Sequence, residues 1–328
     1  MIEAGFLDRL RSAERGALAR ALTILEQGGV PAAELVKAMR QRGASGHATA
    51  LIVGITGPPG VGKSVLTAGL IREIRQSGRS VGVLAVDPSS ATSGGALLAD
   101  RIRMTDCTDD DQVFIRSLAS RGRSGGLAPA VADAAELMEF AGRDVVLIET
   151  VGVGQDAVSL TAYVDVLLLV LMPNLGDELQ AAKAGTVEAA DVIVLNKADL
   201  PAAKAAVRQL RAMIALRDRA AKRPEIICAV AARGEGIEDL WRAVDKAAQA
   251  EPAARQARRD AGLLTRAIET AAGELRTALL DRQLVPGGLL DAIAAGKEGP
   301  AALTEWIFDA LRGFRDQDSG GQAERGEP

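Results

Sequence analysis

Residues 51–64 read LIVGITGPPGVGKS, an apolar run that ends in a glycine-rich loop followed by a lysine and a serine. The part from residue 57 to residue 64 matches the pattern GxxxxGK[ST], which joins a buried strand to the first turn of a helix. Glycines let backbone N–H groups close around phosphate oxygens, and the N-terminus of the helix adds positive potential. The stretch therefore predicts a phosphate-binding loop in an α/β fold, with a chance glycine-rich turn as the alternative.

The chemistry of this loop assigns roles to its residues. Lys63 is expected to reach the β and γ phosphates of a nucleotide, and Ser64 to supply an oxygen to magnesium. The candidate nucleotide-binding residues are Gly57, Pro58, Pro59, Gly60, Val61, Gly62, Lys63, Ser64 and Val65.

The sequence on both sides of the loop predicts the rest of the fold. From about Ala50 to Ala250, short apolar runs alternate with stretches of helical length. The runs are continuously apolar, which suits a mostly parallel sheet covered by helices on both faces. The candidate strands are residues 51–56, 81–86, 113–117, 145–149, 166–172, 192–196 and 226–230. We therefore expect a doubly wound α/β domain of the P-loop NTPase type over residues 46–250.

The flanking segments are expected to be helical. Residues 1–45 carry leucines at intervals of three or four, with Gly28 and Gly29 ending one helix before Pro31 opens the next. Residues 251–315 are rich in Ala, Leu, Arg and Glu with helical spacing. Residues 316–328 form a polar tail of disordered composition.

Composition excludes several classes of function. Lys and Arg total 39 against 43 Asp and Glu, for a net charge of −4, and 2% of residues are aromatic, so we expect no nucleic-acid partner. One histidine and two distant cysteines cannot form a standard transition-metal site, and they favour a reduced, cytoplasmic setting. The most apolar run, residues 166–172, falls well short of the roughly 20 residues of a membrane span. We therefore expect no membrane segment.

A second motif, Asn196-Lys197-Ala198-Asp199, follows the candidate strand 192–196. A carboxylate in this place can accept hydrogen bonds from the ring N–H and the exocyclic amine of guanine, whereas adenine offers no matching pair of donors. Alone, the motif is weak evidence, because exposed turns that contain Asn, Lys and Asp are common. Its position at a strand end downstream of a phosphate-binding loop predicts that Asn196, Lys197 and Asp199 bind guanine.

A third segment, ETVGVGQ at residues 149–155, also closes an apolar strand. Glu149 at this point can hold magnesium, and the Gly152 amide can approach the γ-phosphate. An ordinary strand-to-loop turn is the alternative. Ras-like enzymes place a water-orienting glutamine directly after the glycine; here Gln155 lies further on, so unaided hydrolysis is expected to be slow.

Two more carboxylates are candidate magnesium ligands. Asp87 follows the strand 81–86, and Asp100 lies in the segment GGALLADRIRM. Either can complete the metal shell when its loop closes. The alternatives are a turn cap before proline for Asp87 and a solvated helix face for Asp100.

Taken together, the motifs resemble those of the MeaB-type G proteins, the GTPase chaperones of adenosylcobalamin-dependent acyl-CoA mutases such as methylmalonyl-CoA mutase. The resemblance covers roughly residues 45–245. The segments that carry it are GPPGVGKS, AVDPSS, GGALLADRIRM, ETVGVGQ, MPNLGDELQAAKAG, NKAD and GEGIEDLW.

The resemblance implies a GTP/GDP site with Mg²⁺, slow GTP hydrolysis that a partner stimulates, and a homodimer formed through the C-terminal helices. It implies that adenosylcobalamin is bound by the partner mutase. It assigns nucleotide hydrolysis to Lys63, Glu149, Gln155 and Lys183, magnesium to Ser64, Asp87, Asp100 and Glu149, a base contact to Ala231, and relay of the nucleotide state to Asp177, Gln180 and Lys183. An ATP-dependent kinase of a small molecule or of a periplasmic transport protein is the alternative function, and Asp199 argues against it.

Overall fold

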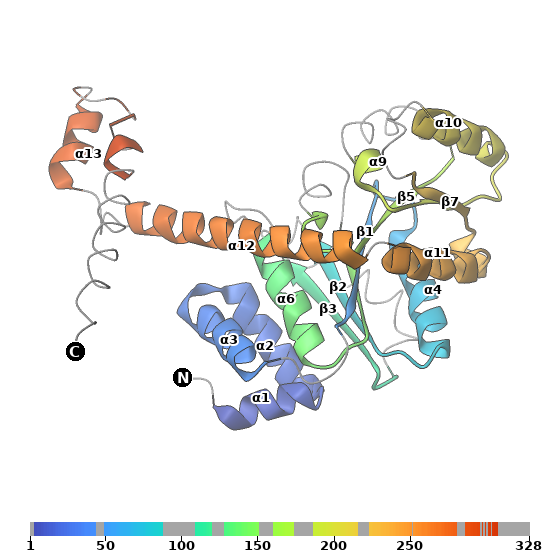
Figure 1. The fold of residues 1–328 in the computed structure, drawn as a ribbon, viewed down its shortest axis with the longest axis horizontal. Coiled ribbons are helices and arrows are strands. Elements are labelled where there is room, and N and C mark those ends of the chain that lie inside the picture. The colour runs from blue at the N-terminus through green and yellow to red at the C-terminus, as the bar shows by residue number, and fades with distance from the viewer. Residues whose placement is uncertain are drawn as a thin grey trace, which may run out of the picture. The chain divides into compact units, whose positions relative to one another are not determined.

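The computed structural model of the chain describes residues 3–43, 49–87, 109–119, 128–150, 160–173, 186–215, 223–250, 252–280, 286–295, 297, 299, 301–302 and 304–307. The chain divides into two compact units, Met1–Thr270 and Ala271–Pro328. Helices in the described ranges are α1 Ala4–Arg11, α2 Arg15–Gln27, α3 Gly29–Arg42, α4 Lys63–Gln76, α6 Ala128–Phe140, α9 Thr186–Ala189, α10 Ala203–Ala215, α11 Ile237–Ala250, α12 Pro252–Leu280 and α13 Gly287–Ala294 (Figure 1).

A parallel sheet forms the centre of the first unit. Its strands are β1 Leu51–Thr56, β2 Val81–Asp87, β3 Val113–Ala119, β4 Val145–Thr150, β5 Val166–Leu171, β6 Val192–Leu195 and β7 Glu225–Cys228. The spatial order is β3-β2-β4-β1-β5-β6-β7, and every strand pairing in the described residues is parallel. The predicted doubly wound α/β fold is thereby confirmed, with each candidate strand found within two residues of its predicted bounds.

The two faces of the sheet are covered by different helices (Figure 1). Successive side chains of a strand point to opposite faces. Val53 and Ile55 of β1 accordingly pack in one apolar cluster with Leu70 of α4, and Leu240 of α11 belongs to the same cluster. Ile52 of β1 belongs to the other cluster, which α2, α3 and α6 complete. Because both faces are buried, the central strands β1, β4, β5 and β6 are almost entirely apolar instead of alternating.

The N-terminal extension is helical as predicted, with one break that the sequence did not indicate. Gly28 ends α2 with a φ of 66°, and Pro31 lies in the first turn of α3. An earlier break separates α1 from α2, where Ala13 adopts a φ of 55°. Arg9 donates two hydrogen bonds of 2.6 Å to Glu14 across this break, so a local ion pair holds the turn.

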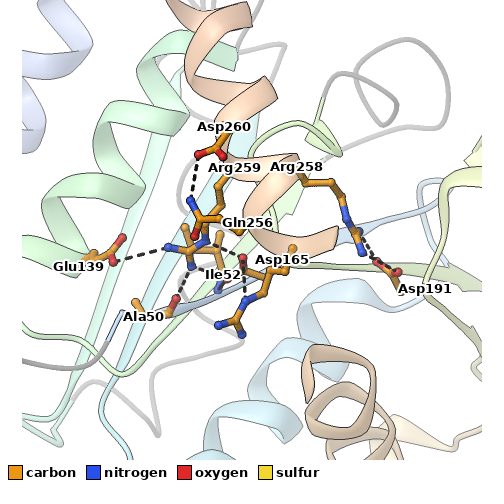
Figure 2. A network of polar contacts seen from close by, with 10 residues as sticks. Ala50, Ile52, Glu139, Asp165, Asp191, Gln256, Arg258, Arg259 and Asp260 are labelled. Atoms are coloured by element: carbon orange, nitrogen blue, oxygen red, sulfur yellow. Dashed lines mark hydrogen bonds and ion pairs between the residues drawn. The ribbon is translucent and has the colours of Figure 1, made fainter. Parts of the chain in front are cut away.

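An ion-pair network fixes the first part of α12 to the edge of the sheet where the strands begin (Figure 2). Asp165 directly precedes β5, and its carboxylate accepts a hydrogen bond of 2.9 Å from the Ile52 N–H. Arg259 of α12 donates to the same carboxylate at 2.6 and 2.7 Å and to the Ala50 carbonyl oxygen at 2.7 Å. Burial by itself lowers the pKa of Arg259, but the hydrogen bonds and charge of Asp165, together with Glu139, outweigh it and raise that pKa.

Asp191 repeats this arrangement one strand along. It directly precedes β6, and its carboxylate accepts a hydrogen bond of 2.9 Å from the Leu167 N–H. Arg258 donates to it at 3.1 and 3.4 Å. Two consecutive arginines therefore hold α12 beside two neighbouring strands, as Figure 2 shows.

The second unit begins within α12 and contains α13. In the described part of the chain, no helix combines the length and the apolar character needed to cross a membrane.

Candidate nucleotide site

The candidate site lies where the parallel strands end. β1 is flanked by β4 and β5, so the chain crosses to opposite sides of it, and ligands of open α/β sheets bind outside the carboxyl ends of strands at such a point. Gly57 follows β1 with a φ of 150°, and an added Cβ there would clash with the Val170 carbonyl oxygen of β5. Only glycine lets the loop pass so close to the neighbouring strand.

Lys63 is the first residue of α4 and is nearly buried, with 7% of its surface exposed. Its Nζ donates hydrogen bonds of 2.8 Å to the Gly57 carbonyl oxygen and 2.9 Å to the Pro58 carbonyl oxygen. The loop thus wraps around the ammonium group, which is held at the N-terminus of the helix where phosphate binding is favoured.

Ser64 and Glu149 form the part of the site that suits a metal ion. Ser64 Oγ donates to Glu149 Oε1 at 2.7 Å, and Thr67 Oγ1, one turn further along α4, donates to Glu149 Oε2 at 2.8 Å. All three side chains are buried. A hydroxyl and a carboxylate are the hard oxygen ligands that Mg²⁺ prefers, so Ser64 and Glu149 fit this ion, and Thr67 orients the carboxylate.

Asn196 joins the predicted phosphate-binding loop to the predicted base-binding motif. Its side chain is buried; Nδ2 donates to the Val61 carbonyl oxygen at 2.8 Å, and Oδ1 accepts from the Ala231 N–H at 3.0 Å. Gly62 lies so near that an added Cβ would stand 2.5 Å from Asn196 Nδ2. The motif at residues 196–199 is therefore held against the loop by Asn196, whose side chain bonds to the backbone of both Val61 and Ala231.

The remaining residues of the base motif lie nearer the surface. Lys197 adopts a φ of 54° and donates from Nζ to the Gly60 carbonyl oxygen at 2.8 Å. Asp199 is exposed and accepts a hydrogen bond of 2.6 Å at Oδ2 from Arg233 Nη2. Arg233 ends a short 3-10 helix, η2 Ala231–Arg233, which follows β7.

The structure thus brings together the predicted loop residues 57–65, Glu149, Asn196, Lys197, Asp199 and Ala231. Asp87 ends β2, and its side chain lies outside the described part of the structure. Asp100, Gly152, Gln155, Asp177, Gln180 and Lys183 also lie outside the described residues. Among the described residues, no group of three or more His, Cys, Asp or Glu side chains is placed to hold a metal ion.

Two residues of the site were missed by the sequence reasoning. Thr67 lies beyond the pattern GxxxxGK[ST], although its spacing of three residues from Ser64 places both on one side of α4. Arg233 lies in the segment Ala-Ala-Arg-Gly-Glu-Gly at residues 231–236, where no spacing rule links it to Asp199.

Comparison with known proteins decides the family. The sequence profile described as methylmalonyl Co-A mutase-associated GTPase MeaB matches residues 18–282. The chain belongs to this family. It is an α/β protein of the GTPase class, and the resemblance predicted from the motifs is confirmed.

Relatives of the MeaB-family chain cover most of its length. A protein of Pyrococcus abyssi is 43% identical over 239 residues, 72% of each chain. The Mus musculus protein named methylmalonic aciduria type A homolog, mitochondrial, is 37% identical over 258 residues, which are 73% of this chain and 62% of that one. The crystal structure of an LAO/AO transport system kinase matches with a TM-score of 0.65 at 24% identity, covering 95% of this chain and 99% of that one, and shows the fold.

Proposed function

We propose that this chain is a GTP-hydrolysing switch that serves an adenosylcobalamin-dependent acyl-CoA mutase. Its nucleotide state gates the loading of adenosylcobalamin onto the mutase and the protection or reactivation of that enzyme. The observation that carries the GTP part is Asn196, whose hydrogen bonds of 2.8 and 3.0 Å link the phosphate-binding loop to the base-binding segment. Membership in a family of mutase-associated GTPases supports the partner.

The phosphate end of the site would bind through Lys63 and the loop amides. Lys63 Nζ, now bonded to the Gly57 and Pro58 carbonyl oxygens, would turn to the β and γ phosphates. Ser64 and Glu149 would hold Mg²⁺, with Asp87 and Asp100 completing the shell. The metal would supply positive charge that stabilises the negative charge developing on the phosphoryl oxygens.

The base end would recognise guanine through Asp199. One carboxylate accepts from both the ring N–H and the exocyclic amine, so adenine leaves it unsatisfied. We assign the Ala231 N–H to the base as well. It donates to Asn196 Oδ1 in this structure and would donate to the base and to Asn196 Oδ1 together when the ligand is bound. Gly152 and Gln155 would act at the γ-phosphate, where the displaced glutamine keeps unaided hydrolysis slow.

The partner would read the nucleotide state through Asp177, Gln180 and Lys183, while adenosylcobalamin stays on the mutase. We further propose a homodimer formed through the C-terminal helices. In the described first part of α12, Leu263, Leu264 and Ile268 are 53%, 63% and 60% exposed, which a second copy would cover. The exposed free thiol of Cys228 suits a cytoplasmic location.

Steady-state GTP turnover tests the proposal. It is measured for the purified chain alone and with methylmalonyl-CoA, isobutyryl-CoA or hydroxyisobutyryl-CoA mutase, with Lys63→Ala as the inactive control. Slow turnover that one mutase raises severalfold supports the function and identifies the partner. Turnover that no mutase changes, or that Lys63→Ala retains, contradicts it; ADP displacing a labelled GDP as well as GDP does would favour the kinase alternative.

A further inference from the structure

Asp199 is engaged by an arginine at the place where guanine is proposed to bind. Arg233 Nη2 donates to Asp199 Oδ2 at 2.6 Å, and the side chains of the pair are 56% and 39% exposed. The pair therefore lies at the surface through which a base would enter.

Guanine needs both oxygens of this carboxylate. The ring N–H and the exocyclic amine are two parallel donors, and each takes one carboxylate oxygen in a paired contact. Arg233 already occupies Oδ2. We propose that Arg233 is a gate on guanine entry, whose guanidinium competes with guanine for Asp199 and has to release Oδ2 before guanine is fully recognised. This inference rests on the proposed role of Asp199 as the guanine reader.

A second carboxylate is placed to receive the released guanidinium. Glu235 Oε1 lies 3.5 Å from Arg233 Nη1 and is 58% exposed on its side chain. The backbone around the arginine is fixed, since the Arg233 N–H bonds to the Val230 carbonyl oxygen at 2.8 Å and the Val230 N–H to the Glu235 carbonyl oxygen at 3.0 Å. Release therefore requires movement of the Arg233 side chain alone, from Asp199 toward Glu235.

The gate acts on nucleotide entry. The Arg233–Asp199 pair exists only while guanine is absent, so its loss speeds GDP association and leaves GDP dissociation unchanged. Exposed ion pairs contribute little free energy, so losing this pair is expected to change the GDP association rate by about two- to fivefold. Inosine diphosphate lacks the exocyclic amine and needs one carboxylate oxygen, so it can bind at Oδ1 while Arg233 keeps Oδ2.

Stopped-flow kinetics with ribose-labelled fluorescent GDP and IDP tests the gate in the full chain. Arg233→Gln is compared with Arg233→Lys, which keeps a cation, and with Arg242→Gln. The last removes an exposed arginine that pairs with Glu238 at 2.8 Å on α11 and serves as the charge-matched control. Glu235→Gln removes the receiving carboxylate and is expected to slow GDP association.

The expected result for Arg233→Gln is GDP association about two- to fivefold faster than in the wild type, with dissociation unchanged. The association rate of IDP changes less than that of GDP. The difference in GDP association rate between Arg233→Gln and the wild type becomes smaller as salt is raised. The association rates of Arg233→Lys and Arg242→Gln stay near those of the wild type. Faster GDP dissociation from Arg233→Gln would overturn the proposal, because Arg233 would then contact the bound nucleotide. Unchanged rates would overturn it too. A wild-type chain that binds no guanine nucleotide would instead overturn the proposed function, and the gate with it.

Discussion

Thr67 shows how one residue outside a motif can set the geometry of a candidate metal ligand. Its hydroxyl is buried and donates to Glu149 Oε2, while Ser64 donates to Oε1, so both carboxylate oxygens of Glu149 are held from α4. Removing a partner of a buried polar group costs about 1–3 kcal/mol, and partners that orient a metal ligand change metal affinity by about 10–100-fold.

We therefore expect Thr67→Val, which keeps the shape of the side chain, to unfold a few degrees below the wild type and to need about tenfold more Mg²⁺ for GTP turnover. Thr67→Ser keeps the hydroxyl and is the matched control. Thermal unfolding and a Mg²⁺ titration of turnover check both effects. If Thr67→Val has the Mg²⁺ requirement of the wild type, Thr67 does not position Glu149 for a metal.

Asp199 carries the second prediction at this scale. In Asp199→Asn the side-chain amide can donate to the 2-carbonyl of xanthine while its oxygen accepts from the ring N–H. GDP affinity is expected to fall at least about tenfold, because the exocyclic amine of guanine loses its acceptor and the bond from the ring N–H is made to a neutral group, and XDP affinity is expected to rise. Competition between labelled GDP and unlabelled XDP measures the change. An Asn variant that still prefers GDP would show that another residue reads the base.

The sequence predicted single residues best where backbone chemistry fixes them. Gly57, Gly62 and Lys63 belong to one short pattern because a loop of this kind has to fold closely around its ligand, and the structure places Asn196 against this loop. Arg233 was missed because its hydrogen bond to Asp199 joins residues 34 positions apart and depends on where the chain runs after β7.

Among the elements, the strands were predictable because both faces of the sheet are buried. A strand such as β5, residues 166–171, is buried on both faces and is therefore apolar throughout, and a short continuously apolar run indicates a strand of this kind. The break between α1 and α2 was not predictable, because Ala13 takes a φ of 55° with neither glycine nor proline to mark it. The contacts of Arg258 and Arg259 were also hidden, since charged residues on a helix usually face water.

The part of α12 that belongs to the first unit is held to the sheet by those arginines. Arg259 pairs at 2.6 Å with Asp165, whose side chain is fully buried, whereas the hydrogen bonds of Arg258 to Asp191 are longer, at 3.1 and 3.4 Å. Removing one member of a buried ion pair costs about 3–5 kcal/mol because it leaves an uncompensated charge.

Arg259→Leu is accordingly expected to lower the unfolding temperature by about 10 °C, and Arg258→Leu by less. Arg242→Leu, at an exposed pair on α11, should change it by no more than about 2 °C. Differential scanning calorimetry of the three variants provides the ranking. Equal effects of Arg259→Leu and Arg242→Leu would mean that the pair with Asp165 does not fix α12.

In the first unit as a whole, the candidate nucleotide site and the attachment of the first part of α12 lie at opposite ends of the parallel strands. β5 and β6 run between them. Each begins beside an aspartate that pairs with an arginine of α12, and Asn196 of the predicted guanine motif directly follows the last residue of β6. Glu139 of α6 belongs to this network, with its Oε1 3.7 Å from Arg259 Nη1. Burial raises the pKa of Glu139, an effect that the charge of Arg259 opposes and that of Asp165 reinforces.

This raised pKa makes the stability of the molecule depend on pH in a definite direction. Between the ordinary value of 4.5 and the folded-state pKa, the folded chain binds more protons at Glu139 than the unfolded chain does. The contribution of Glu139 to the free energy of unfolding is therefore fully present below pH 4.5 and is lost as the pH rises through the folded-state pKa. A neutral side chain at this position avoids the loss.

Glu139→Gln is thus expected to unfold at a higher temperature than the wild type at pH 7.5, with the difference vanishing as the pH approaches 4, where the wild-type carboxyl is itself neutral. Glu136→Gln, on the same helix, is the matched control of opposite sign, because Glu136 accepts hydrogen bonds of 2.8 and 2.9 Å from Arg40 and the substitution removes the charge and one of the two acceptors. Thermal unfolding from pH 4 to 8 measures both. A Glu139→Gln chain that is less stable than the wild type at pH 7.5 would show that the charge of Arg259 outweighs burial at this carboxyl.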